Sequence, residues 1–328
     1  MKKIFLLLAI ATISLSVKAQ NVDKLIDSNE VKRIIQTLAA DDMEGRLIFT
    51  PGIEKAAQFI AAEFKKIGLD PLPGKADYRQ QIDKVQPPRM LSSQNINPDM
   101  PLVNVVGVIP GKTKPEEFVV FSAHYDHLGK FLAKPMNGDS IANGADDDAS
   151  GTTAVIALAN YFKKINDNDR TLIFVAFVGE ELGGYGAKYF SKQLNPDKVV
   201  AMFNIEMIGK ASKFGTNSAF ITGYERSDFG PILQKSLKGT KFTFYPDPYP
   251  EQNLFFRSDN ATLARLGVPA HTISTDQIDI DKFYHTVKDE VSTLDMVNIV
   301  STIKAIALSS RSIVSGEATP TRVAKMMN

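Results

Sequence analysis

The chain has 328 residues, with 38 lysine and arginine residues against 37 aspartate and glutamate residues, and no cysteine. A near-zero net charge without an arginine-rich arm argues against a nucleic-acid partner. The absence of cysteine excludes a disulfide scaffold, a lipid anchor on cysteine and any thiolate nucleophile or ligand, so a metal would have to be bound by His, Asp and Glu.

The N-terminus has the pattern of a secretory signal peptide. Met1-Lys2-Lys3 is basic, residues 4–17 are mostly apolar, and Val17-Lys18-Ala19 fits a cleavage site. The apolar run is shorter than the roughly 20 residues of a spanning helix, and we expect no later segment to be apolar for long enough to span a bilayer. We therefore predict a signal peptide at 1–19, and a mature chain that is secreted or periplasmic and has no membrane segment.

The next segments predict a helix and then an irregular stretch. Apolar residues recur at helical spacing from Ala56 to Ile67, and Gly68 suits the position after the last turn. Residues 70–100 carry five prolines among polar residues, which favours an irregular excursion.

From Leu102 onward, apolar runs alternate with helical stretches. We predict strands at 103–109, 118–123, 172–178, 199–205, 218–222 and 268–273, and helices at 150–164, 184–194, 227–237 and 294–314. This alternation predicts an α/β fold with a mostly parallel central sheet flanked by helices on both faces, in a single domain over 20–316. The polar tail, 317–328, is expected to be frayed.

Ionisable residues stand where these predicted strands end. Glu180-Glu181 follows one strand, His124-Tyr125-Asp126 a second and Glu206 a third, while Asp146-Asp147-Asp148 precedes a helix. Each has an ordinary explanation, such as a helix cap, a solvated turn or a hydrogen-bonded histidine. Strand carboxyl ends gather on one edge of a parallel sheet, where such folds place their chemistry, so their joint position favours a metal site.

The adjacent acids Glu180 and Glu181 have a further implication. Neighbouring side chains diverge there, so one carboxylate could bind a metal while the other faces the water that the metal activates. His285 follows an Asp-rich loop and is a further candidate ligand. His127 and His271 have no comparable setting, so we expect structural roles for them, with His127 at most beside the ligands.

These segments together resemble the M28 peptidases, zinc-dependent aminopeptidases and their relatives. The resemblance extends over nearly the whole mature chain, beginning with a lead-in at Glu44-Gly45-Arg46 and including the segments 122–126, 143–151, 177–183, 204–209, 257–259 and 284–286. It implies an M28-type zinc peptidase domain at 20–316. One departure is Glu206, because that motif more often carries Asp.

The resemblance also implies a role for each position. Asp147 would bridge two zinc ions, with His124 and Glu206 completing one site and Glu181 and His285 the other. Glu180 would be the general base and Asp126 would orient His124, so both are counted as catalytic. Asp148 would shape the turn after Asp147, which in the family often contains a cis peptide.

The favoured function is therefore a secreted, di-zinc aminopeptidase that removes residues from the N-termini of peptides. The alternative is a glutaminyl cyclase-like acyltransferase, which would use one zinc. A third reading is a receptor-like relative without activity, which the complete ligand set disfavours. The substrate side-chain pocket is expected between Phe244 and Phe256, with Tyr245, Tyr249, Leu254, Phe255 and Phe256 as an apolar wall, unless these residues pack in the core.

Overall fold

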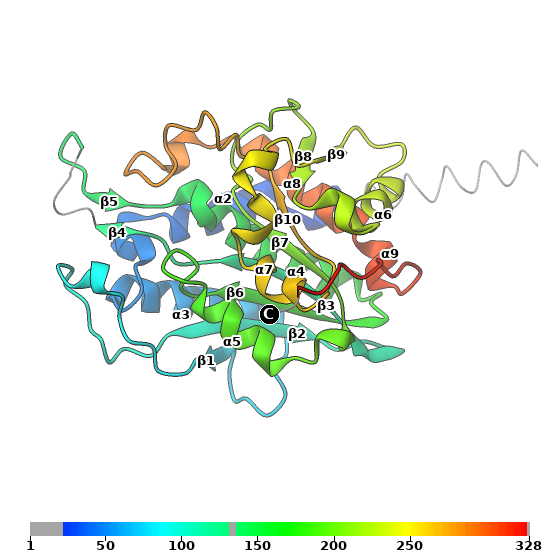
Figure 1. The fold of residues 1–328 in the computed structure, drawn as a ribbon, viewed down its shortest axis with the longest axis horizontal. Helices are drawn as coiled ribbons and strands as arrows, with labels where there is room; N and C mark the ends of the chain where they lie inside the picture. Colours follow the sequence, from blue (N-terminus) through cyan, green and yellow to red (C-terminus); the bar gives the residue numbers. More distant parts are fainter. Residues whose placement is uncertain (1–21, 131–135, 327–328) are drawn as a thin grey trace, which may run out of the picture.

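The computed structural model describes residues 22–130 and 136–326, so the predicted signal peptide lies outside the described residues. Eight strands form one twisted sheet in the order β1-β2-β6-β3-β7-β10-β8-β9 (Figure 1). Their bounds in that order are Arg79–Gln81, Val103–Ile109, Arg170–Phe177, Lys114–His124, Val199–Ile205, Ala270–Ser274, Ser218–Ile221 and Thr243–Pro246. A separate hairpin pairs β4 (Gly129–Lys130) with β5 (Ile141–Ala142).

The centre of the sheet is parallel and its flanks are mixed. Strands β6, β3, β7 and β10 run in one direction, and β8 pairs parallel to β9. Strands β1 and β2 pair antiparallel, as do β2 with β6 and β10 with β8. The sequence therefore correctly predicted a mostly parallel sheet.

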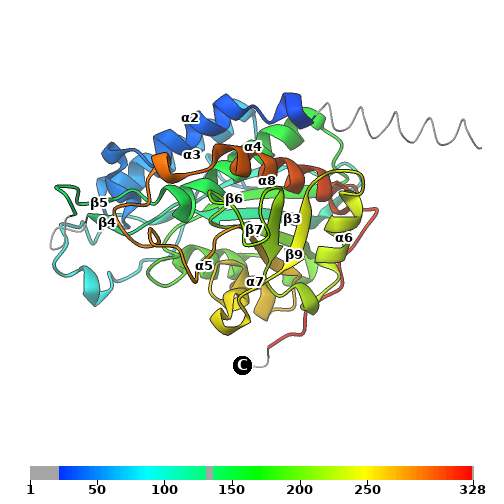
Figure 2. The same ribbon diagram turned by 90° about the horizontal axis from the view of Figure 1, so that it is seen from above.

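Helices cover both faces of the sheet, as Figure 2 shows. One layer holds α2 (Ser28–Leu38), α3 (Pro51–Ile67), α4 (Gly151–Ile165), α8 (Met296–Ser309), α6 (Phe229–Ser236) and α9 (Arg311–Val314). The other face carries α5 (Tyr185–Gln193) and α7 (Asn260–Arg265). Side chains of β3 alternate between the two cores: Val119 and Phe121 pack with the larger helical layer, and Val120 with the smaller one.

Several predicted boundaries agree closely with the structure. Strands β2 and β7 coincide with the predictions at 103–109 and 199–205, because strands buried on both faces are written as continuous apolar runs. Helix α3 ends at Gly68, whose φ of 81° is the left-handed conformation of a C-terminal cap. The predicted helix at 294–314 is instead divided into α8 and α9.

The stretch Met296–Val314 is long and apolar enough to cross a membrane, contrary to our reading of the sequence. Within it, 61% of the most apolar window is buried inside the protein, and α8 packs against α4 and α6. The stretch is accounted for as core helix.

The prediction of a frayed tail is wrong for residues 317–326. Arg170 donates a hydrogen bond to the carbonyl of Ala318 at 2.6 Å, and Arg322 donates one to the carbonyl of Val199 at 2.7 Å. Val323 is buried against the core on the α7 face. The arginines fix the tail's backbone, an effect that its polar composition does not reveal.

Candidate metal centre

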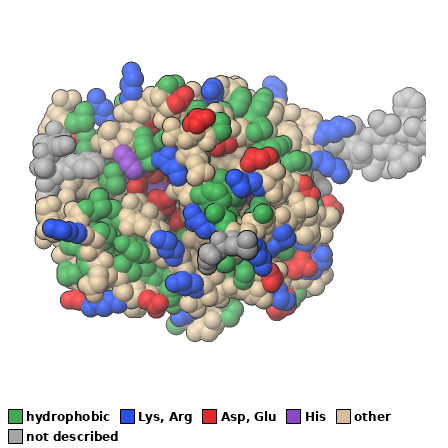
Figure 3. Space-filling view, in the orientation of Figure 1, with side chains coloured by type: hydrophobic (Ala, Val, Ile, Leu, Met, Phe, Trp, Pro, Cys, Tyr) green, Lys and Arg blue, Asp and Glu red, His purple; other side chains and the backbone are tan. Residues whose placement is uncertain are grey.

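The predicted ligands converge at the carboxyl ends of the parallel strands. His124 is the last residue of β3, Glu181 lies in the turn after β6, and Glu206 directly follows β7. Asp147 lies in the turn Ala145–Ser150 that leads into α4, and His285 lies in the loop between β10 and α8. Five segments of the chain thus bring these side chains to one edge, where a histidine and acidic side chains adjoin on the surface (Figure 3).

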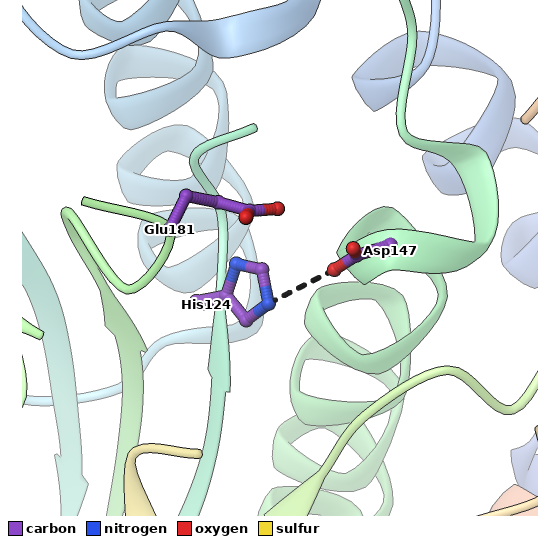
Figure 4. Close-up of side chains that lie close together, drawn as sticks. All are labelled: His124, Asp147 and Glu181. Carbon is purple, nitrogen blue, oxygen red and sulfur yellow. Dashed lines mark ion pairs between the residues drawn. The ribbon is translucent and has the colours of Figure 1, made fainter. Parts of the chain in front are cut away.

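Asp147 lies at the centre of the cluster because its two carboxylate oxygens face different histidines. Its Oδ1 is 3.2 Å from Nε2 of His124, whereas its Oδ2 is 3.2 Å from Nε2 of His285. In Figure 4, His124 extends from the end of its strand toward Asp147 at the start of α4, with Glu181 beside both. One carboxylate therefore separates two groups of donor atoms.

Glu181 belongs to the group around His285. Its Oε2 is 3.2 Å from Nε2 of His285, and its Oε1 is 2.8 Å from Nδ1 of His127. His127 is completely buried and thus supports Glu181 from behind, while its backbone N–H donates to the carbonyl of Arg46. The sequence predicts a structural role for His127, at most beside the ligands, and the contact with Glu181 agrees with that expectation.

Glu180 and Glu206 line the same cavity as Asp147, Glu181 and His285. The cavity has a volume of about 300 Å³ and is also lined by Tyr284, whose ring stacks on His285 at 3.8 Å. Glu180 therefore reaches the space in front of the ligands, where a general base must lie. The structure brings every sequence-predicted ligand and the predicted base together.

Asp126 acts through a different contact from the one expected. Its backbone carbonyl, rather than its carboxylate, is the nearest partner of His124 Nδ1, at 3.1 Å against 3.8 Å. Its Oδ1 accepts hydrogen bonds from the backbone N–H groups of Gly179 and Glu180 at 2.7 and 3.1 Å. Asp126 thus fixes both His124 and the turn that carries Glu180.

Two other carboxylates hold the turn around Asp147. Asp148 accepts from the backbone N–H groups of His124 and Met207, which joins the ends of β3 and β7. Asp289 accepts from the N–H groups of Asp146 and Asp147 at 2.9 and 3.0 Å. The sequence foresaw a shaping role for Asp148 but missed Asp289. The Asp147–Asp148 peptide is cis, as the resemblance implies.

Burial and mutual repulsion divide the carboxylates into two groups. Burial, with the negative charges of Glu206, Asp259 and Glu181, raises the pKa of Glu180 well above its usual value, and burial also raises the pKa of Glu206. Burial alone would raise the pKa of Asp147 too, but the close contacts with the imidazoles of His124 and His285 outweigh it and hold that pKa well below its usual value.

The pKa values of the two proposed ligand histidines, His124 and His285, are both raised, opposite to that of Asp147. Burial disfavours their charged forms, but Asp147 and neighbouring carboxylates outweigh it and hold the pKa of His124 well above its usual value. In the same way, hydrogen bonds to Asp147 and Glu181 raise the pKa of His285 to about 10. In the metal-free protein, protons on imidazole thus supply the positive charge that the cluster needs.

These donors fit a zinc ion. Nε2 of His124 is buried without a hydrogen bond, although Asp147 Oδ1 is only 3.2 Å away, so both atoms face one space. His124, Asp147 and Glu181 each offer an atom within 4.8 Å of the others. Imidazole nitrogen and carboxylate oxygen are donors that Zn²⁺ accepts at catalytic sites.

The expected apolar wall at 244–256 is wrong except for Leu254, the one residue of the five that lines the cavity. Phe255 is buried in the core against His271, and Tyr249 packs on Phe220. The remaining apolar lining comes from Met207, Phe220 and Ile278. Core packing, the alternative for those aromatic residues, holds for Phe255 and Tyr249.

Comparison with known proteins places this chain in a family. The model described as peptidase family M28 matches residues 104–309. The chain belongs to peptidase family M28. The chain is similar to Leucine aminopeptidase 1 of Emericella nidulans, with 30% identity over 216 residues, which cover 61% of this chain and 53% of that protein. A probable zinc metalloprotease of Leptosphaeria maculans, Lema_P086240, is 32% identical over 168 residues, covering 50% of this chain and 36% of the relative. This chain therefore spans only part of the length of these relatives.

Solved structures share the M28 fold. The zinc aminopeptidase BSAP of Bacillus subtilis superposes with a TM-score of 0.68 at 14% identity, covering 92% of this chain and 99% of that chain. A glutaminyl cyclase of Porphyromonas gingivalis gives a TM-score of 0.65 at 15% identity, with 88% and 99% coverage. Because a peptidase and a cyclase both match, the fold alone does not decide between these activities.

Proposed function

We propose that this M28 member is a secreted, zinc-dependent aminopeptidase with two zinc positions, which hydrolyses N-terminal residues from peptides. One observation carries the proposal: the two oxygens of Asp147 lie 3.2 Å from different histidines, His124 and His285. A single-metal site has no need of this bridging arrangement. His124 with Glu206 would hold one ion, and Glu181 with His285 the other.

In the proposed mechanism, zinc activates water and Glu180 transfers its proton. Bound zinc would polarise the scissile carbonyl and lower the pKa of a water molecule. Glu180, in the cavity beside the ligands, accepts the proton of the attacking water and delivers it to the nitrogen of the leaving amine. One C–O bond forms and the peptide C–N bond breaks, so the products are an amino acid and a shortened peptide.

The cavity supports an apolar residue at the N-terminus of the substrate. Its walls include Met207, Phe220, Leu254 and Ile278, which would contact the side chain next to the scissile bond. We expect leucyl and methionyl substrates to be cleaved with higher kcat/KM than glycyl or aspartyl substrates, because burial of each extra CH₂ contributes about 0.8 kcal/mol.

Zinc stoichiometry and a substrate panel together test the proposal. We expect about two zinc ions per chain by elemental analysis, release of free amino acid from leucyl substrates, and no ammonia from N-terminal glutaminyl peptides. One zinc with ammonia release would identify the cyclase instead. Two bound zinc ions without turnover of any substrate would support a binding-only role. N-terminal sequencing of exported protein, with Gln20 expected first, tests secretion.

A further inference from the structure

Arg46 is a buried cation that binds to both sides of the candidate metal centre. It lies between α2 and α3 and is fully buried. Its Nε donates to the carbonyl of Tyr125 at 2.7 Å, and its Nη1 donates to those of Leu38 and Asn143 at 2.7 and 2.6 Å. Its Nη2 donates to the carbonyl of Gly144 at 2.8 Å. One rigid guanidinium thus donates hydrogen bonds to four neutral carbonyl groups.

Two of these carbonyls belong to the segments that carry proposed ligands. Tyr125 directly follows His124, and Gly144 precedes Asp147 by three residues. The two segments meet Arg46 from different parts of the chain, one at the end of β3 and the other before α4. A single side chain therefore sets the separation of the segments that carry His124 and Asp147.

Other residues of the same turn strengthen the connection. Asp41 accepts a hydrogen bond from Nδ2 of Asn143 at 2.8 Å, and Glu44 forms an ion pair with Lys130 at 2.6 Å. Gly45 approaches Ala142 so closely that an added Cβ would lie 2.4 Å from that residue's carbonyl oxygen. The turn 41–46 therefore packs against residues 125–130 and 142–144 without room for adjustment.

The electrostatic setting also points toward the metal centre. No carboxylate of the described residues forms an ion pair with Arg46. Burial lowers the pKa of Arg46, while the negative charges of Asp289, Asp126, Asp147 and Asp148 act to raise it. Asp147 is itself a proposed ligand, and the other three carboxylates contact or flank the proposed ligands. The negative charge of the site thus offsets part of the cost of burying the guanidinium.

We propose that Arg46 is a positioning residue for the metal centre, which makes the N-terminal segment before the M28 match at 104–309 a functional part of the site. The inference rests on the proposed function, because it concerns the spacing of zinc ligands. Loss of the guanidinium should let the segments of His124 and Asp147 move apart, and it should therefore lower metal affinity more than it lowers the stability of the metal-free fold.

Arg170 provides a matched control. It is also a fully buried arginine, and it donates to the carbonyls of Ile313 and Ala318 and to the hydroxyl of Thr319. It lies at the start of β6, at the opposite end of the strand from Glu181, and none of its partners is a proposed ligand. An effect common to both arginines would reflect burial alone.

Cobalt binding distinguishes the two roles. Arg46→Lys and Arg170→Lys would be freed of metal and titrated with Co²⁺, whose visible absorption reports the ligand geometry. We expect Arg46→Lys to weaken Co²⁺ binding by at least about tenfold, the scale of support around metal ligands, and to alter the spectrum. Arg170→Lys should lower Tm but leave affinity and spectrum unchanged.

Wild-type affinity and spectrum in Arg46→Lys would overturn the inference, as would equal losses of affinity in both variants. Wild-type protein that binds no Co²⁺ or Zn²⁺ would overturn the proposed function and this inference with it.

The unmutated protein offers a second test that does not depend on folding of a variant. If the hydrogen bonds of Arg46 favour metal binding, then metal binding must favour those hydrogen bonds to the same extent, because such coupling is reciprocal. Zinc should therefore slow amide hydrogen exchange in residues 39–50, and it should leave residues 313–320 around Arg170 unchanged. No protection of 39–50, or equal protection of both segments, would contradict the role of Arg46.

Discussion

The two ends of the sheet differ in how their buried ionisable side chains are paired. At the start of β6, Arg170 meets the carboxylate of Glu117 at 2.6 Å, and its other donors meet acceptors. At the opposite end, Arg46 binds only carbonyls, while nearby ionisable atoms remain without partners. Among the described residues, the buried His and Asp atoms without a hydrogen bond belong to His124, Asp126, His127, Asp146, Asp259 and Asp276, all around the strand carboxyl ends.

This contrast separates stability from function. Buried polar atoms are ordinarily hydrogen-bonded, because an unpaired one costs about 1–3 kcal/mol. The buried charge of Arg170 is paired with Glu117, so that end needs no metal ion. Unpaired imidazole and carboxylate atoms at the other end create a demand for a cation. Substitutions at the two ends should therefore have separable effects.

The largest separation is expected for Glu180→Gln. If Glu180 is the base, this variant should retain zinc and lose at least about a hundredfold in kcat, the scale of general acid–base catalysis. Its stability should not fall, because glutamine is neutral and similar in size, and burial already disfavours the charged form of Glu180. Glu117→Gln at the other end should keep kcat and lower Tm. Near-normal turnover in Glu180→Gln would remove Glu180 from the mechanism.

Asp147→Asn should remove the connection between the two metal positions. We expect both zinc ions to be depleted, so that the variant loses, for each ion, the stabilisation of about 2.7 kcal/mol that zinc at a hundred times its Kd would give. Asp146→Asn is the control, because an amide oxygen can still accept the 2.7 Å hydrogen bond from Gly209 N–H. Thermal unfolding with and without zinc measures both; equal losses would show that Asp147 is not the bridging residue.

Substitutions of Glu206 test the proposed metal position that it shares with His124. Glu206→Gln should weaken the zinc shared with His124 by more than the ten- to a hundredfold typical of residues that only support a ligand, about 1.4–2.7 kcal/mol. Glu206→Asp should keep two ions with altered affinity or rate, since the shorter acid is the more common one in the family. Unchanged two-zinc binding in Glu206→Gln, measured by titration, would refute ligation.

The smallest effect expected is a pH dependence of the metal-free protein. The pKa of His285 is raised to about 10 from an ordinary 6.5, so its protonated form stabilises the fold. This contribution is complete below pH 6.5 and is lost as pH rises toward 10. We expect Tm to fall over that window in the wild type and to change less in His285→Ala. Identical slopes would contradict the shift.

Elements of the fold could be predicted from the sequence where their burial produces a run or a period of apolar residues. The strands β2 and β7 were located to the residue because their burial requires apolar runs. Helix α2 was missed although Val31, Ile34, Ile35 and Leu38 have helical spacing, so that signal was available. The short elements β1, β9 and α7 carry too few residues to show a period.

For the site, the convergence of the predicted ligands could be foreseen, because each motif but that of His285 coincides with a strand end or with the turn before a helix. The contacts of their supports could not, because Asp289 and His127 act across the fold. Arg46 was noticed only as part of a lead-in, since its importance comes from carbonyl groups that no sequence pattern marks.

The two ligand histidines also differ in access to solvent, with a consequence for how fast metal exchanges. The side chain of His124 is 1% exposed, whereas that of His285 is 37% exposed and belongs to a loop rather than a strand. If two zinc ions bind as proposed, a competing chelator should reach an ion on the His285 side without movement of the sheet. An ion beside His124 should be released only after its neighbour has left. Metal loss should then occur in two kinetic phases, with the partly emptied protein persisting as an intermediate long enough to be loaded with a second kind of ion.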